Sequence, residues 1–206
     1  MSQANATVFI VDDDLSVLKG LSRLLRSARL NPVTFASPEE FLDRHDPHAP
    51  GCLVLDVAMP GLDGLQLQQA LIAKGSEIPI IFLTGQGDIP TSVQAMKGGA
   101  VDFLTKPVHD DCLLAAIRAA IEKDRQQRQA GAEVAEIRQR LATLTPRERE
   151  VLEHVISGQL NKQTAAELGT VEKTIKVHRA RMLAKMKVQS VAELVRLAEK
   201  TGIRAA

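Results

Sequence analysis

Apolar and polar positions along the first 122 residues follow a pattern typical of alternating strands and helices. Five apolar runs have the length of strands and lie at residues 7–11, 32–35, 52–55, 79–83 and 101–104. Stretches with apolar residues at helical spacing follow them, at residues 16–28, 38–44, 64–73, 91–97 and 110–122. Strands that are apolar along their whole length are typical of parallel sheets covered on both faces. The pattern therefore predicts a doubly wound α/β domain with a five-stranded parallel sheet.

The pattern changes in residues 123–143, which are rich in Gln, Arg, Glu and Ala. This composition predicts a helical, exposed linker that continues the preceding helix. Gly131 is the only helix breaker in the segment, so we expect a hinge near it. Alternatively, Val134, Ile137 and Leu141 form a short coiled-coil seam, although their spacing covers only one or two heptads.

Residues 144–206 predict a separate all-helical module. Its first helix begins with Thr145 as N-cap, Pro146 at the first helical position and Glu148 three residues after the cap. Three further helices are expected at residues 161–168, 171–186 and 191–200. Gly169 lies in the turn between the second and third helices, and such a pair is typical of a helix-turn-helix.

The charge of the chain is divided unevenly among these segments. Residues 1–122 carry 9 Lys and Arg against 15 Asp and Glu, a net charge of −6. Residues 123–143 carry a net charge of +2, and residues 144–206 carry 12 against 7, a net charge of +5. A basic module joined to an acidic domain is typical of a sensing module that is tethered to a polyanion-binding one.

Composition favours a cytoplasmic protein with two small domains. The chain has 206 residues, 45% of them hydrophobic, with five Phe and no Trp or Tyr, so the cores must be aliphatic. No apolar stretch approaches the ~18 residues of a membrane span, and the N-terminus lacks the pattern of a signal peptide. Cys52 and Cys112 are too isolated for a metal site, and we expect reduced thiols.

Polar residues follow four of the predicted strands at their carboxyl ends. Asp12 and Asp13 follow the first, Asp56 the third, Thr84 the fourth and Lys106 the fifth. In an open parallel sheet these ends meet at one crevice, so three carboxylates, a hydroxyl and an ammonium group should converge there. Each of these polar residues alone is common at a strand end and does not indicate a function. Their occurrence together, in this order on successive strands, does indicate a functional site.

The converging carboxylates predict a cation site and a phosphoryl acceptor. Two carboxylates about 4 Å apart repel by roughly 4 kcal/mol at an effective dielectric of about 20, so three need a cation. Mg²⁺ suits such an all-oxygen site. Asp56 would attack phosphorus as the nucleophile, while Lys106 and Thr84 would bind the phosphate oxygens. Asp14 is a weaker ligand candidate, and we prefer it as a helix N-cap.

Residues 7–122 resemble a two-component receiver domain, and the string from Thr84 to Pro107 is similar to the FixJ-like subgroup. The resemblance implies a flavodoxin-like fold with Asp56 as phospho-acceptor and Mg²⁺ (or Mn²⁺) held by Asp12, Asp13, Asp56 and the Ala58 carbonyl. It also implies that Thr84 and Phe103 form the switch. In receivers, side chains at positions 58 and 86 help to orient or block the hydrolytic water. Ala58 cannot orient a water, and Gln86 could do so only through its amide.

The third helix of the basic module combines an apolar and a basic face. Ile175, Met182, Leu183 and Met186 should face inward, which leaves its Lys and Arg for solvent or phosphate. Residues 144–198 resemble the LuxR-type DNA-binding domain. The resemblance rests on three motifs, Leu-Thr-Pro-Arg-Glu-Arg-Glu-Val-Leu, Asn-Lys-Gln-Thr-Ala and Thr-Ile-Lys-Val-His-Arg. The resemblance implies that residues 171–186 enter the major groove, with Lys176 and Val177 at base edges. The other implied DNA-contacting residues are Lys162, Lys173, Thr174, His178 and Arg181.

The two resemblances together predict a NarL/FixJ-family response regulator. A sensor histidine kinase would phosphorylate Asp56, and the regulator would form a homodimer, bind double-stranded promoter DNA and work with RNA polymerase. The dimer face would contain Val93, Met96, Lys97, Val101 and Asp102. The chain would not be an enzyme beyond its own phosphoryl transfer, and no membrane partner is expected.

Three rival functions differ in what they require. A phosphorylation-independent DNA binder would carry a vestigial receiver, yet the acidic set is complete. A phosphohydrolase with an aspartyl-phosphate intermediate typically has a second Asp two residues after the nucleophile, where this chain has Ala58. An RNA-binding antiterminator would need a different module after residue 143.

Overall fold

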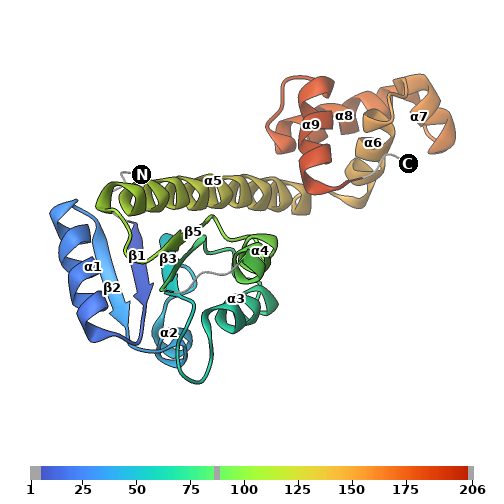
Figure 1. Cartoon of the computed structure of the whole chain (residues 1–206). Coiled ribbons are helices and arrows are strands. Elements are labelled where there is room, and N and C mark those ends of the chain that lie inside the picture. The colour runs from blue at the N-terminus through green and yellow to red at the C-terminus, as the bar shows by residue number, and fades with distance from the viewer. Residues whose placement is uncertain (1–5, 86–88, 204–206) are drawn as a thin grey trace. The chain divides into compact units, whose positions relative to one another are not determined.

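The computed structural model describes residues 6–85 and 89–203, and the N-terminal part of the chain forms a five-stranded parallel sheet. Its strands are β1 (Thr7–Val11), β2 (Asn31–Phe35), β3 (Gly51–Asp56), β4 (Ile80–Thr84) and β5 (Asp102–Thr105). The spatial order is β2-β1-β3-β4-β5, and all four ladders are parallel (Figure 1). The strand order reverses between β1 and β3, which is where doubly wound sheets bind ligands. The predicted flavodoxin-like fold class is confirmed.

Helices cover both faces of this sheet (Figure 1). The helices are α1 (Leu15–Ser27), α2 (Pro38–Arg44), α3 (Gly64–Ala73), α4 (Ile89–Lys97) and α5 (Asp110–Ala142). Successive residues of β1 point to opposite faces, so Val8 and Ile10 pack with α1 and α5, whereas Phe9 and Val11 pack with α2, α3 and α4. The sheet therefore has a core on each face. The core under α1 and α5 is aliphatic, as predicted, but the core under α2, α3 and α4 gathers all five Phe of the chain, so the expectation of aliphatic cores was wrong for that face.

The second compact unit consists of the end of α5 and four shorter helices. Those helices are α6 (Pro146–Ile156), α7 (Asn161–Glu167), α8 (Glu172–Met186) and α9 (Val191–Thr201). Thr145 caps α6 in a capping box with Glu148, as predicted. Ile175 and Met182 of α8 are fully buried and Leu183 is half-buried, so the predicted inward face is confirmed.

Helix α5 is continuous where we expected a hinge. The contacts of the chain divide between Arg128 and Gln129, and the helix continues through Gly131. A single glycine costs a helix only about 1 kcal/mol, and the residues on either side of Gly131 are good helix formers. Tertiary contacts on both sides of the glycine also hold the helix, so this small cost does not break it.

One set of these contacts lies in the first unit. Asp124 is buried and its Oδ2 accepts a hydrogen bond from the Gly51 amide at 3.0 Å. The Arg128 guanidinium donates to the carbonyl oxygens of His48 and Ala49 at 2.9 and 2.8 Å. These bonds fasten α5 to the segment that leads into β3, six residues beyond the predicted end of the receiver at residue 122.

The other set lies in the second unit. Ile137 and Leu141 belong to the same core as residues of α6, α8 and α9, so they do not form the coiled-coil seam that was the alternative prediction. Lys200 Nζ lies 2.6 Å from Glu133 Oε1, and Arg140 donates to the Met186 carbonyl at 3.2 Å. The last turns of α5 thus form a fifth helix of this unit. No helix in the described ranges is long and apolar enough to cross a membrane.

We predict that Ile137→Ala destabilises the second unit by about 2–5 kcal/mol, because it leaves a cavity in a core where Ile137 is 2% exposed. The neighbouring half-buried Val134 provides the matched control, and Val134→Ala should cost much less. Hydrogen exchange followed by mass spectrometry resolves peptides of each unit. Equal effects of the two substitutions would contradict the packing described here.

Candidate phosphoryl-acceptor site and helix-turn-helix surface

Strand register brings the predicted acidic residues together. Val11 of β1 pairs with Leu55 of β3, so the next residues, Asp12 and Asp56, lie side by side at the carboxyl ends of the two strands. In the same way, Thr84 ends β4 opposite Thr105 of β5, and Lys106 follows directly. The Lys106 amide donates to the Thr84 carbonyl at 2.7 Å, which fixes the start of the lysine side chain beside the crevice.

The Lys106 ammonium group bridges two buried carboxylates. Its Nζ lies 2.6 Å from Asp12 Oδ2 and 2.7 Å from Asp56 Oδ1. Asp12 is 2% exposed and Asp56 is 6% exposed, whereas the lysine side chain keeps 26% of its surface in solvent. Hydrogen bonds between ionised groups at such distances are stronger than those between neutral groups. The arrangement therefore holds the buried Asp56 carboxylate in an ion pair with Lys106.

The acid–base properties of the site reflect burial as well as pairing. Burial raises the pKa of the Asp56 carboxyl, and the hydrogen bond and charge of Lys106 oppose this without cancelling it. Burial works against the charge of Lys106, but the hydrogen bonds and charges of Asp12 and Asp56 outweigh it and raise the pKa of the ammonium group. The charged form of Asp56 is therefore the costly one in this crevice.

The carboxylate oxygens of the site are the kind of ligand that a hard divalent cation prefers, but only two of the three predicted carboxylates lie together. Asp12 and Asp56 already share one cationic group, and oxygen ligands are those that Mg²⁺ prefers. Asp13 is exposed, and the described residues contain no group of three or more His, Cys, Asp or Glu side chains arranged for a metal ion. Asp14 caps α1 through a 2.7 Å hydrogen bond from the Ser16 amide, which confirms its predicted capping role.

The remaining predicted receiver residues line the same end of the sheet. Thr84 is buried at the end of β4. Phe103 of β5 is half-buried, and its ring centroid lies 6.1 Å from that of Phe82. Ala58 is exposed two residues after Asp56. Gln86, the other position considered for hydrolysis, lies outside the described residues.

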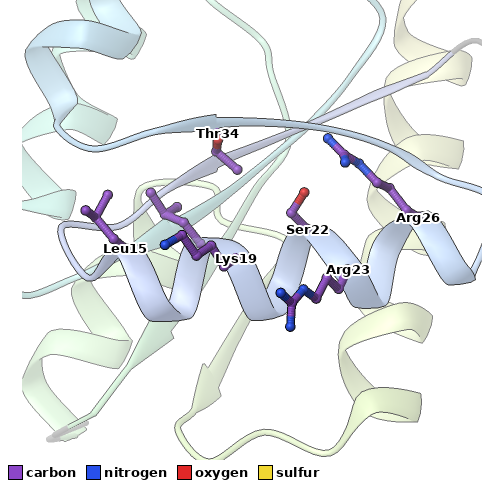
Figure 2. Close-up of a pocket in the computed structure, with 7 residues that line it drawn as sticks. Leu15, Lys19, Ser22, Arg23, Arg26 and Thr34 are labelled. Carbon is purple, nitrogen blue, oxygen red and sulfur yellow. The ribbon is translucent and has the colours of Figure 1, made fainter.

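A groove between α1 and β2 was not predicted. It measures about 300 Å³ and is lined by Leu15, Leu18, Lys19, Ser22, Arg23, Arg26 and Thr34. Figure 2 shows Lys19, Ser22 and Arg26 along the side of α1 next to β2. Helix α1 contains no acidic residue, although the domain as a whole is acidic. The three cations at helical spacing in an acid-free helix were visible in the sequence, but the groove itself was not, because Thr34 of β2 forms part of its wall.

The residues predicted to contact DNA lie on α7 and α8, and most are accessible. Lys162, Lys173, Lys176 and Arg181 are exposed, and Val177 is 43% exposed despite being apolar. Thr174 and His178 are half-buried. The predicted DNA-contacting residues thus lie together on a largely accessible surface of the two helices.

Two polar contacts on this surface were missed from the sequence. Arg179 Nη1 donates to Asn161 Oδ1 at 2.9 Å, so this arginine ties α8 to the start of α7. Lys176 Nζ lies 2.9 Å from Glu172 Oε1, and this ion pair joins residues about one helical turn apart. The spacing of four residues between Glu172 and Lys176 was visible in the sequence, whereas the Arg179 contact joins two helices and was not.

Comparison with known proteins identifies both parts of the chain. Residues 8–118 match the response regulator receiver domain, and residues 142–198 match the family described as bacterial regulatory proteins, luxR family. This chain belongs to the NarL/FixJ family of response regulators. The regulator therefore combines a receiver with a LuxR-type DNA-binding domain and acts in transcription regulation. Its relatives include the response regulator protein TodT of Pseudomonas putida and the transcriptional regulatory protein FixJ of Bradyrhizobium diazoefficiens.

Similar proteins match the regulator over nearly its whole length. Nodulation protein W of Bradyrhizobium diazoefficiens is 48% identical over 204 residues, which cover 99% of this chain and 90% of that protein. The transcriptional regulatory protein FixJ of the same organism is 43% identical over 196 residues, covering 95% and 96%. The solved structure of the response regulator StyR is 47% identical, covers 95% of this chain and 99% of its own, and superposes with a TM-score of 0.86.

We predict that Asp56→Asn stabilises the regulator increasingly as pH rises. Because the folded-state pKa of Asp56 is raised, the folded protein retains this proton at pH values where the unfolded chain has lost it. The Asp56 contribution to the free energy of unfolding therefore falls as pH rises from the unfolded pKa through the folded one. Urea unfolding of both proteins at about pH 4 and about pH 7.5 measures the difference. If the difference in the free energy of unfolding between Asp56→Asn and wild type became smaller at the higher pH, burial would not be raising the pKa of Asp56.

Proposed function

We propose that the regulator is switched by phosphorylation of Asp56 by a sensor histidine kinase. The observation that carries this proposal is the single ammonium group of Lys106 within 2.7 Å of both Asp12 and Asp56. An oxygen of Asp56 attacks phosphorus as the phosphorus–nitrogen bond of the kinase phosphohistidine breaks, so the phosphoryl group moves to the carboxylate. The regulator contributes positioning and charge to this transfer and no other enzymatic activity.

The residues around Asp56 have separate roles in this proposal. Lys106 moves from the carboxylate to a phosphate oxygen, and the Thr84 hydroxyl donates to another. Asp12, Asp13 and Asp56, with the Ala58 carbonyl, hold Mg²⁺ or Mn²⁺. When bound, this cation offsets the negative charge of the phosphoryl group and of the carboxylates. The exposed Asp13 supplies the ligand that the buried pair lacks.

The kinase binds the groove along α1. The groove begins at Leu15, which is exposed and follows the Asp12–Asp14 run directly. A partner seated there lies close to the carboxyl end of β1, next to Asp56 in the strand register. The cations of α1 favour an acidic surface on that partner.

Phosphorylation is converted into dimerisation at α4 and β5. The Thr84 hydroxyl moves toward the phosphoryl group and Phe103 turns inward. Ile89, Val93 and Met96 of α4 are exposed apolar residues at helical spacing, and they form the centre of the dimer face. The other residues assigned to this face are Lys97, Val101 and Asp102. A shift of the switch from 1:99 to 99:1 needs about 5.5 kcal/mol, more than one new charge-assisted hydrogen bond supplies, so dimerisation and DNA provide the rest.

The dimer presents two copies of α8 to adjacent turns of promoter DNA in the cytoplasm, where it works with RNA polymerase. Lys176 and Val177 lie at base edges, with lysine at guanine acceptors and valine at a thymine methyl group. Phosphate contacts come from Lys162, Lys173, Thr174, His178 and Arg181. The exposed cations of this face and the net charge of +5 in residues 144–206 support this assignment.

We predict that acetyl phosphate with Mg²⁺ promotes both dimerisation and binding to DNA fragments in the wild-type regulator, whereas Asp56→Asn responds in neither assay. The substitution keeps the size of the side chain but removes the nucleophile. Light scattering measures the mass, because the chain has no Trp for fluorescence, and gel shift measures the binding. Equally tight binding in all conditions by both proteins would instead establish a vestigial receiver and a phosphorylation-independent DNA binder.

We predict that the purified phosphorylated regulator keeps its phosphoryl group for many minutes or longer. The Ala58 methyl group can neither donate nor accept a hydrogen bond, so it cannot place a water in line with phosphorus. Ala58→Asn introduces an amide at this exposed position and should shorten the lifetime. Loss of radiolabelled phosphate over time measures both proteins. Half-loss from the wild type within seconds, without a phosphatase, would refute the prediction.

A further inference from the structure

Glu172 is the one acidic residue of α8 and lies at its first position, on a helix with five Lys and Arg. Its side chain is 46% exposed, and it pairs with Lys176, which is 62% exposed. An acidic group near a helix N-terminus is favourable by itself, and surface ion pairs at this spacing contribute little. A carboxylate that approaches DNA phosphates, however, weakens binding unless a hydrogen-bond donor lies opposite it.

The major-groove edge of a G·C pair offers both groups that this ion pair needs. Guanine presents acceptors at O6 and N7, and cytosine presents the N4 amino group as a donor. The cytosine N4 and guanine O6 atoms are themselves joined by a hydrogen bond of ordinary length, about 2.9–3.0 Å. The Lys176 Nζ and Glu172 Oε1 atoms are 2.9 Å apart, so the ion pair matches the spacing of the two base atoms.

We propose that Glu172 and Lys176 act as one unit that recognises a single G·C base pair, with Lys176 donating to guanine and Glu172 accepting from cytosine N4. The inference rests on the proposed entry of α8 into the major groove, and it adds Glu172 as a specificity-determining residue. Both residues lie in the first five positions of α8, the part of a recognition helix that contacts base edges.

The test selects binding sites from a random DNA library with the full-length regulator in acetyl phosphate and Mg²⁺. Wild type should prefer G·C at one position of each half-site. Glu172→Ala and Lys176→Ala should each lose this preference about tenfold, at the same position, and the double variant should discriminate no worse than either. Lys173→Ala is the matched control, because the loss of a phosphate contact weakens all sites and leaves the preferred sequence unchanged.

A chemical substitution in the DNA then tests the contact itself. A cytosine analogue without the 4-amino group at the selected position should weaken binding of the wild type and leave Glu172→Ala unaffected. Glu172→Ala should also bind non-specific DNA more tightly, because it removes a negative charge near phosphate. An unchanged preferred sequence in Glu172→Ala would overturn the inference. A wild type that selects no sequence at all would instead show that the proposed DNA readout by α8 is wrong.

Discussion

Two buried carboxylates at the ends of β1 and β3 need a positive charge between them, and the Lys106 ammonium group provides it. This requirement links three strands, because Asp12, Asp56 and Lys106 reach the same point only if β1, β3 and β5 end together. Asp56 is also the residue that the proposed function modifies. A carboxylate whose charge is costly responds strongly to any change in the cations and donors around it.

Helix α5 belongs to two cores in turn. Its beginning packs on the sheet through Leu113 and Ile117, and Asp124 and Arg128 fasten it to the segment before β3. Its end contributes Ile137 to the core of the DNA-binding unit. A segment that looks like a solvated linker by composition is therefore anchored by specific contacts on both sides of Gly131, with only a few residues between them.

Much of the fold could be predicted because it depends on short-range patterns. Strands of continuous apolar residues, helices of regular spacing and the Thr145 capping box were all visible in the sequence. The polar residues at strand ends were also visible, and their convergence followed from the geometry of parallel sheets. A break in the helix at Gly131 was expected and is absent, because the contacts that hold each part of α5 lie outside its own sequence. The groove of α1 was missed because its walls come from two elements.

The sequence by itself determined the element types, the order of the two domains and the chemical groups at the carboxyl ends of the strands. The tertiary structure decided which of these groups meet. Lys106 joins Asp12 across 94 residues and Asp56 across 50, Asp13 remains exposed, and Arg179 reaches Asn161 on another helix. Periodicity and capping act over a few residues, whereas charge neutralisation and core packing depend on contacts between distant parts of the chain.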